Sequence, residues 1–157
     1  MLLQNFIATL TLSSAAVAQT LNIPTRVGSI VSLASPNAIS ALGDCNVLIQ
    51  GGGAQEAKDK VVQHNGRGAV TIKDFTVVND GKLYRSCGNC SNNGHPRNVV
   101  IQNVKKKGVS ELVGINSNYG DTPNISGSCG SNVKKVCQEY MGVGKGQWRE
   151  SEGQHYS

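Results

Sequence analysis

Three cations stand at spacings that could place them in one site. Lys82 follows Lys60 by 22 residues, and Arg85 follows Lys82 by three. Crowded cations repel one another, which favours the neutral form of a lysine and makes it a base. The same cations can hold a carboxylate. Together these properties fit β-elimination from a uronate, in which the acid group is held while the proton alpha to it is removed. The alternative is chance placement of three cations on the surface.

A Cys-x-x-Cys pair follows these cations directly. Cys87 and Cys90 could form a redox pair, half of a zinc site or a small disulfide loop. Proximity along the chain predicts that Cys87 pairs with Cys90 and that Cys129 pairs with Cys137, which leaves Cys45 without a partner.

His64 is a candidate base, metal ligand or substrate-binding residue. It lies at a predicted strand-to-turn junction, where a histidine is also typical as a hydrogen-bonded structural residue. A zinc site that adds Cys87, Cys90 and His95 is disfavoured, because the second ligand pair lacks zinc-finger spacing and oxidised cysteines do not bind metal. The sequence contains no P-loop, GxSxG or HExxH motif.

A recurring apolar phrase predicts the elements that would position these residues. Segments 46–50, 69–73 and 98–102 share the frame x-Val-x-Ile-polar, with their valines 23 and 29 residues apart. Each reads as a short β-branched strand followed by Gly, Asp or Asn turn residues. One such unit cannot bury its own apolar face, so the repeat predicts a parallel β-helix of stacked coils. The alternative is a β-sandwich, whose strands recur at shorter spacings of about 8–12 residues.

A β-helix would bring the three cations together. Positions one coil apart stack on the same face of a solenoid, which fits the spacing of Lys60 and Lys82. In a regular strand Lys82 and Arg85 would face opposite ways, but a bulge or turn at Gly81 could turn both to one side. The sequence therefore predicts a cationic groove.

Composition and charge suit one domain with an acidic partner. The chain of 157 residues is long enough for its own hydrophobic core, and its formal net charge is +5. Aromatic residues make up only 4% and are not interleaved with arginine, which argues against nucleic-acid binding by stacking. We expect a monomer that binds an acidic polysaccharide; the alternative is an ordinary basic surface with no partner.

Both ends of the chain are expected to lie outside the folded domain. Residues 1–18 combine an apolar run with a small-x-small cleavage pattern, which predicts a secretory signal peptide; the alternative is a buried N-terminal helix. Residues 19–145 would form the domain, and the polar segment 146–157 is expected to be a disordered tail. The apolar run is too short to span a bilayer, so we expect a secreted, extracellular protein without membrane contact.

Several longer motifs then occur in an order typical of one family. They are NVLIQGGGAQEAKDKVVQHNGRGAVTIKDFTVVN, GKLYRSCGNC, RNVVIQNVKKKG, ELVGINSNYGD and KKVCQEY. With them, the stretch from Asn46 to Gly142 resembles the fungal and bacterial pectate lyases of polysaccharide lyase family 3. The resemblance implies a right-handed, single-stranded parallel β-helix that is secreted. It also implies calcium-dependent cleavage of de-esterified pectin, or polygalacturonate, by β-elimination.

The resemblance also implies roles for individual residues. Lys60, Lys82 and Arg85 correspond to the basic catalytic residues, with Lys60 or Arg85 as the base that takes the C5 proton and Lys82 assisting. Lys82, Arg85 and His64 are expected to bind the substrate. The Cys-x-x-Cys disulfide would staple the adjacent loop.

The chain departs from the family between residues 36 and 38. Family members carry several coils there, including acidic calcium ligands and further cysteines, so the sequence predicts a shortened solenoid that has lost these coils. The resemblance implies calcium as the cofactor, and its ligands in this chain are unknown. An alternative function is a catalytically impaired, secreted pectin-binding protein that lost the calcium ligands. A small disulfide-stapled protein that acts on host proteins would leave the ordered motifs unexplained.

Overall fold

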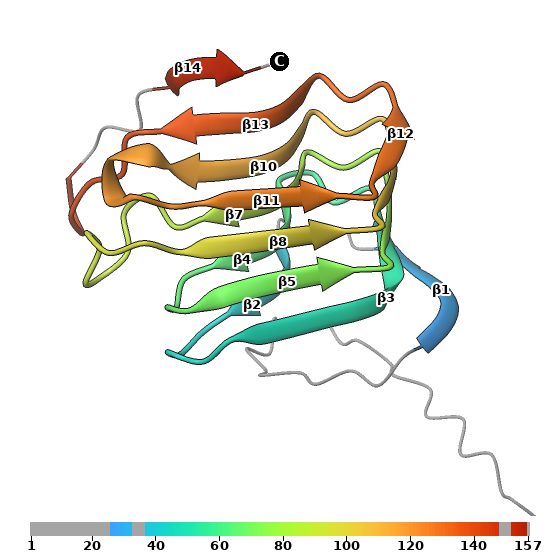
Figure 1. Ribbon diagram of the computed structural model, residues 1–157, viewed down its shortest axis with the longest axis horizontal. Coiled ribbons are helices and arrows are strands. Elements are labelled where there is room, and N and C mark those ends of the chain that lie inside the picture. Colours follow the sequence, from blue (N-terminus) through green and yellow to red (C-terminus); the bar gives the residue numbers. More distant parts are fainter. Residues whose placement is uncertain (1–25, 33–36, 148–151, 157) are drawn as a thin grey trace, which may run out of the picture.

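The computed structural model is an all-β molecule whose strands wind as a parallel β-helix (Figure 1). The structure describes residues 26–32, 37–147 and 152–156. The predicted signal peptide, residues 1–18, lies outside these ranges. Within them, no helix has the length and apolar character that a membrane span requires.

Two sheets form the walls of the solenoid. The six-stranded sheet contains β2 (Asn37–Ala41), β4 (Lys60–His64), β7 (Lys82–Ser86), β10 (Glu111–Asn116), β13 (Lys135–Tyr140) and β14 (Glu152–Tyr156). The eight-stranded sheet contains β1 (Arg26–Ser32), β3 (Val47–Gln55), β5 (Ala69–Lys73), β6 (Thr76–Val78), β8 (Asn98–Gln102), β9 (Lys105–Lys107), β11 (Pro123–Ser126) and β12 (Cys129–Ser131). The 3-10 turn η1 (Ser117–Tyr119) follows β10.

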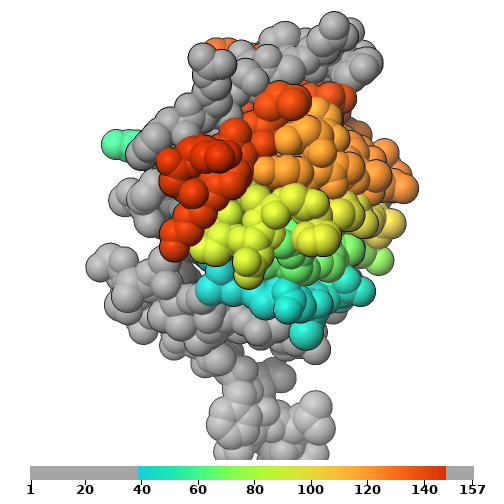
Figure 2. All heavy atoms as spheres, turned by 90° about the vertical axis from the view of Figure 1, so that its left-hand side faces the viewer, coloured from blue at the N-terminus to red at the C-terminus, as the bar shows by residue number. Residues whose placement is uncertain are grey.

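Successive coils lie on one another in sequence order. One coil runs through β4, β5 and β6, the next through β7, β8 and β9, and the next through β10, β11 and β12. Strand β3 bends at the corner, because its first residues pair with β5 and its last residues pair with β6. Figure 2 shows the result as bands of colour that follow the chain from one end of the molecule to the other.

The recurring apolar phrase forms a ladder inside the eight-stranded sheet. In β3, β5 and β8 the valines pair with one another, and so do the isoleucines. All of these side chains are buried: Val47, Val70, Val99, Ile49, Ile72 and Ile101. Burial of one such side chain stabilises a fold by about 1.5–3 kcal/mol. The predicted parallel β-helix is confirmed, and the β-sandwich alternative is wrong.

Asn and Asp residues form the corners between strands, as the turn residues of the sequence predict. Asp74, Asn79 and Asn103 have φ angles of 52°, 58° and 51°. Asn and Asp tolerate this left-handed conformation better than most residues. Asn103 Nδ2 donates a hydrogen bond to Asp74 Oδ1 at 3.1 Å, so the corners of neighbouring coils are tied together.

The second predicted disulfide is not formed. Cys129 lies in β12 and Cys137 in β13, which belong to different sheets, and both residues are free. Proximity along the chain misled the prediction, because the coil passes from one sheet to the other through residues 132–134. Burial raises the pKa of Cys137 to about 11. Cys45 is also free, as predicted.

The polar end of the chain contains a strand where the sequence predicts disorder. Strand β14 pairs antiparallel with β13, in contrast to the parallel pairing of the coils before it (Figure 1). The physical reason is that the outer edge of β13 offers backbone donors and acceptors to a neighbouring segment. The domain boundaries themselves stay a prediction.

Candidate functional site

The six-stranded sheet stacks the predicted lysines in register. Lys60 in β4 pairs with Lys82 in β7. Lys82 pairs in turn with Glu111 in β10, and Glu111 with Lys135 in β13. The prediction that Lys60 and Lys82 stack one coil apart is confirmed by this register.

Asp59 joins the two lysines at the start of β4 and β7. The amino group of Lys60 forms an ion pair with Asp59 Oδ2, and Lys82 Nζ lies 3.9 Å from Asp59 Oδ1. The side chains of Lys60, Lys82 and Asp59 are 23%, 27% and 40% exposed. We call these three residues the lysine end of the site; solvent reaches all of them.

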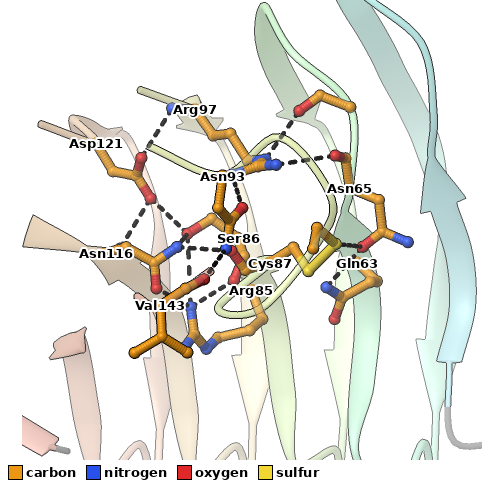
Figure 3. Close-up of a disulfide and its surroundings, with 12 residues drawn as sticks. Gln63, Asn65, Arg85, Ser86, Cys87, Asn93, Arg97, Asn116, Asp121 and Val143 are labelled. Atoms are coloured by element: carbon orange, nitrogen blue, oxygen red, sulfur yellow. Dashed lines mark hydrogen bonds between the residues drawn. A yellow bond between two sulfur atoms is a disulfide. The ribbon is translucent and has the colours of Figure 1, made fainter. Parts of the chain in front are cut away.

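Arg85 lies on the same strand as Lys82 but in different surroundings. Its side chain is only 2% exposed, and its Cζ lies 3.9 Å from the centroid of the Tyr140 ring. Its Nη1 donates to the Ser86 carbonyl and, at 3.0 Å, to Asn116 Oδ1 (Figure 3). The structure therefore brings Lys60 and Lys82 to one carboxylate and keeps Arg85 apart from it, buried three residues further along β7.

Glu111 lies between these two groups of residues. Its Oε2 accepts a hydrogen bond from the Tyr140 hydroxyl at 2.7 Å, and its Oε1 has no hydrogen-bond partner among the described residues. Burial raises the pKa of Glu111, against the effect of the Tyr140 hydrogen bond and of the nearby charges of Lys82 and Arg85. The carboxylate is thus buried among cations.

Gly114 makes room for this arrangement. A Cβ at this position would lie 2.3 Å from Glu111 Oε1, 2.7 Å from Arg85 Cδ and 3.1 Å from Tyr140 Cε2. Real Cβ atoms essentially never come within 3.0 Å of another atom, and 3.1 Å is a tight contact. A glycine at position 114 therefore lets the three side chains meet over β10.

A buried polar network surrounds the guanidinium of Arg85. Asn116 donates through Nδ2 to Ser86 Oγ at 3.0 Å and to the Cys87 carbonyl at 2.9 Å. Asp121 Oδ2 accepts from Ser86 Oγ at 2.5 Å and from the Asn116 backbone N–H at 2.8 Å. Ser86 and Asn116 are fully buried and Asp121 is 6% exposed.

Arg97 extends the network to the neighbouring coil. Its backbone N–H donates to Asp121 Oδ1 at 2.8 Å. Its guanidinium donates to the Gly66 carbonyl at 2.8 Å, and to the Asn65 carbonyl and Asn93 Oδ1, each at 3.0 Å (Figure 3). We call the connected residues the arginine end of the site: Arg85, Ser86, Arg97, Asn116 and Asp121.

The first predicted disulfide borders the arginine end. Cys87 and Cys90 are bonded, as predicted, in the loop that follows β7. Because the Cys87 carbonyl accepts from Asn116, this loop is attached to the same network as Arg85.

His64, the predicted substrate-binding residue, is buried at the end of β4, and its role stays a prediction. The ring is 1% exposed and both of its nitrogens have partners. A carbonyl only accepts, so Nε2 donates to the Arg67 carbonyl at 3.2 Å and Nδ1 accepts from the Tyr84 hydroxyl at 2.8 Å. Burial lowers the pKa of His64. These contacts are compatible with the hydrogen-bonded structural role that the sequence also allows.

The described residues do not fit a resident calcium ion. Among them, no group of three or more His, Cys, Asp or Glu side chains converges. Calcium requires six to eight oxygen ligands. The carboxylate of Glu111 lies beside the predicted site, but the charges of Lys82, Arg85 and Lys135 are close to it and would repel a calcium ion. The calcium ligands implied by the resemblance stay unidentified.

Sequence reasoning missed the residues that support the cations. Asp59 could have been found as the neighbour of Lys60. Glu111 and Asn116 both lie in the motif ELVGINSNYGD, and neither is connected to the cations by spacing alone. Asp121 ends the same motif, and nothing in the sequence alone connects it to Arg85.

Comparison with known proteins identifies one family. Residues 35–147 match the family model described as pectate lyase. A probable pectate lyase E of Neosartorya fischeri is 62% identical over 95 residues, which cover 60% of this chain and 37% of that protein. Pectate lyase H of Emericella nidulans is 56% identical over 102 residues, covering 64% of this chain and 39% of that protein.

Solved structures agree with these relatives. The catalytic domain of pectate lyase PelI from Erwinia chrysanthemi has a TM-score of 0.70 and 36% identity, and the match covers 78% of this chain and 60% of that one. PelI in complex with tetragalacturonic acid has a TM-score of 0.68 and 38% identity, with 77% of this chain and 43% of that one covered. The chain spans less than half of the length of the curated relatives it matches.

Proposed function

The chain belongs to the pectate lyase family, and we propose that it cleaves polygalacturonate by β-elimination. The observation that carries the proposal is the register of β4 and β7, in which Lys60 stacks on Lys82 with Arg85 further along the same strand. These are the residue types that the reaction needs: cations to hold a uronate carboxylate, and an amine that can take a proton.

The proposed reaction begins with the carboxylate. Lys82 holds the acid group of one galacturonate unit, and Arg85, buried three residues further along β7, adds its positive charge. Both charges stabilise the negative charge that develops when the C5 proton leaves. Lys60 first passes its ammonium proton to water and then, as an amine, takes the C5 proton. The electrons of the C5–H bond form a C4–C5 double bond. The C4–O bond breaks, and the leaving oxygen takes a proton from water. The product carries an unsaturated uronate at its new end.

Lys60 is a better candidate for the base than Arg85. An arginine guanidinium keeps its proton in proteins, whereas a lysine can lose it. Lys60 is also accessible to solvent, while Arg85 is buried. The carboxylate of Asp59, which contacts Lys60, would stabilise the ammonium ion that forms when the proton arrives.

We propose that the partner is an acidic polysaccharide and that the protein acts as a secreted monomer. The net charge of +5 favours an acidic partner, and a related pectate lyase has been solved in complex with tetragalacturonic acid. In this proposal residues 1–18 are the signal peptide and residues 19–145 the lyase domain. The family implies calcium, but the described residues do not fit the ion, and the proposed reaction uses only side chains of the protein and water.

The test is the release of unsaturated uronate from polygalacturonate, followed by ultraviolet absorbance with added calcium and again with a chelator. We expect product from the wild-type chain and a loss of about 10²- to 10⁴-fold in rate for Lys60→Ala. Lys105→Ala is the control, because Lys105 is an exposed lysine of the other sheet. No product from the folded chain under either condition would overturn the proposal, as would a Lys60→Ala variant with the wild-type rate.

A further inference from the structure

We propose that Asn116 is a positioning residue for Arg85, acting from the next coil of the solenoid. Strand β7 carries Arg85, and β10 carries Asn116 at its end. The proposed effect on turnover rests on the function proposed above for Arg85. The geometric part, that Asn116 determines where the guanidinium lies, can be tested without any enzyme activity.

The hydrogen bonds allow only one orientation of the Asn116 amide. Its Nδ2 donates to the Cys87 carbonyl at 2.9 Å. A carbonyl can only accept a hydrogen bond, so the amide cannot be turned over to place its oxygen there. Oδ1 therefore faces Arg85 and accepts from its Nη1 at 3.0 Å (Figure 3).

The donor and acceptor types of its partners also determine the orientation of the Ser86 hydroxyl. Asp121 is an acceptor, so the single hydroxyl proton of Ser86 goes to Asp121 Oδ2 at 2.5 Å. The oxygen of Ser86 is then available to accept from Asn116 Nδ2 at 3.0 Å. Asp121 also holds the backbone N–H of Asn116 at 2.8 Å, so the amide is fixed at both its side chain and its main chain.

Two acceptors of the protein fix one nitrogen of the guanidinium. The Asn116 amide oxygen and the Ser86 carbonyl oxygen are both neutral, and they fix Nη1 of Arg85. The Tyr140 ring lies against the guanidinium. A charge fixed in this way needs no reorganisation when negative charge develops on the substrate.

Asn93 offers a matched comparison within the same chain. Its Oδ1 accepts from Arg97 Nη1 at 3.0 Å and its Nδ2 donates to the Val143 carbonyl at 2.8 Å. It thus holds a different arginine by the same chemistry as Asn116.

The kinetic test is a double-mutant cycle with polygalacturonate as substrate. We expect Asn116→Ala to lower kcat/KM by about 10- to 100-fold in the wild-type chain, the range for loss of a hydrogen bond to a charged group. In an Arg85→Lys background the same change should cost less than about threefold, because the group it positions is gone. Asn93→Ala should cost the same factor in both backgrounds. Equal losses for Asn116→Ala in both would show a merely structural role and overturn the proposal.

The second test needs no activity. The Arg85 side-chain N–H signals can be assigned in an NMR spectrum by their loss in Arg85→Lys, and their exchange with water measured. Exchange should become at least about tenfold faster in Asn116→Ala and stay unchanged in Asn93→Ala. If Asn116→Ala does not fold, Asn116→Ser, which keeps a polar group too short to reach Arg85, replaces it.

The two tests separate the two proposals. Unchanged Arg85 exchange in the Asn116 variants would overturn the positioning role, whatever the activity of the chain. A wild-type chain that forms no product while Asn116 variants release Arg85 would overturn the proposed function and leave the positioning role intact.

Discussion

The two ends of the site hold their cations in opposite ways. At the lysine end, Lys60 and Lys82 share the half-exposed carboxylate of Asp59. At the arginine end, Arg85 is buried and its partners belong to a network that continues to Asp121. A group that must exchange protons needs contact with water, and a group that must recognise a planar carboxylate needs a fixed geometry. Strand β7 carries one cation of each end, Lys82 and Arg85.

A substitution at the arginine end should therefore lower the free energy of unfolding more than a substitution at the lysine end. An ion pair exposed to solvent contributes about 0–1 kcal/mol to stability, because water and salt screen it. A buried donor that loses its acceptor costs about 1–3 kcal/mol, because nothing replaces the lost hydrogen bond. Five substitutions test this difference, beginning with the one expected to have the largest effect.

Asp121→Ala should have the largest effect. It leaves three buried donors without their acceptor: the Ser86 hydroxyl and the backbone N–H groups of Arg97 and Asn116. We expect the free energy of unfolding to fall by about 3–5 kcal/mol, measured by urea denaturation. Asp59→Ala at the lysine end is the control. If the two variants lose similar amounts of unfolding free energy, the two ends do not differ in the way described.

Gly114→Ala should have the next largest effect. The new methyl group would overlap Glu111, Arg85 and Tyr140, so side chains or backbone must shift at a cost of about 1–3 kcal/mol. Turnover should fall as well, because the Arg85 stem lies in the path of the methyl group. The control is Gly144→Ala, where the nearest atom lies 3.5 Å from the added Cβ, an ordinary contact. Urea denaturation and initial rates check both variants, and equal effects would contradict the account of Gly114.

The solenoid and its lysines could be predicted because both follow from periodicity. The x-Val-x-Ile-polar frame recurs at the length of one coil, and the same spacing stacks Lys60 on Lys82. The length of a coil can be read from the spacing of similar residues in the sequence, without knowledge of the three-dimensional structure. The spacing of three residues from Lys82 placed Arg85 in the same set, and the resemblance then implied a role for all three cations.

The other features depend on register between coils and could not be predicted. Asn116 reaches Arg85 across 31 residues, and Asp121 reaches Ser86 across 35. These separations exceed one simple coil length because loops of unequal length intervene. The failed pairing of Cys129 with Cys137 has the related cause that a short separation can cross from one sheet to another.

Glu111 lies between the two ends, and Glu111→Gln tests how its ionisation affects the pH dependence of stability. Burial raises the pKa of Glu111 above its ordinary value of 4.5. The folded state therefore binds more protons than the unfolded state between these two values, and the stability due to Glu111 is full below pH 4.5 and is lost as the pH rises through the folded pKa. Glutamine has no such loss, so the variant should gain stability relative to wild type as the pH rises from 4.5. Denaturation at a series of pH values measures it.

Tyr140→Phe sharpens the same experiment. The Tyr140 hydroxyl donates to Glu111 and lowers its pKa, so its removal should raise that pKa further and move the loss of stability to higher pH. The opposite result would be a wild-type stability that rises relative to that of Glu111→Gln as the pH increases. It would mean that the nearby cations lower the pKa of Glu111 more than burial raises it.

Asp59→Asn should have the smallest effect on stability, since it removes the charge at the lysine end while keeping the size of the side chain. We expect a loss within about 1 kcal/mol that shrinks further in high salt, because the screening length falls from about 10 Å at 0.1 M to about 3 Å at 1 M. The loss caused by Asp121→Ala should not change with salt, because its partners are buried hydrogen-bond donors. Urea denaturation of both variants at low and high salt makes the comparison. If the Asp59→Asn loss matched that of Asp121→Ala and ignored salt, water would not be screening the lysine end. Lys60 would then lack the solvent contact that its proposed role as a base requires.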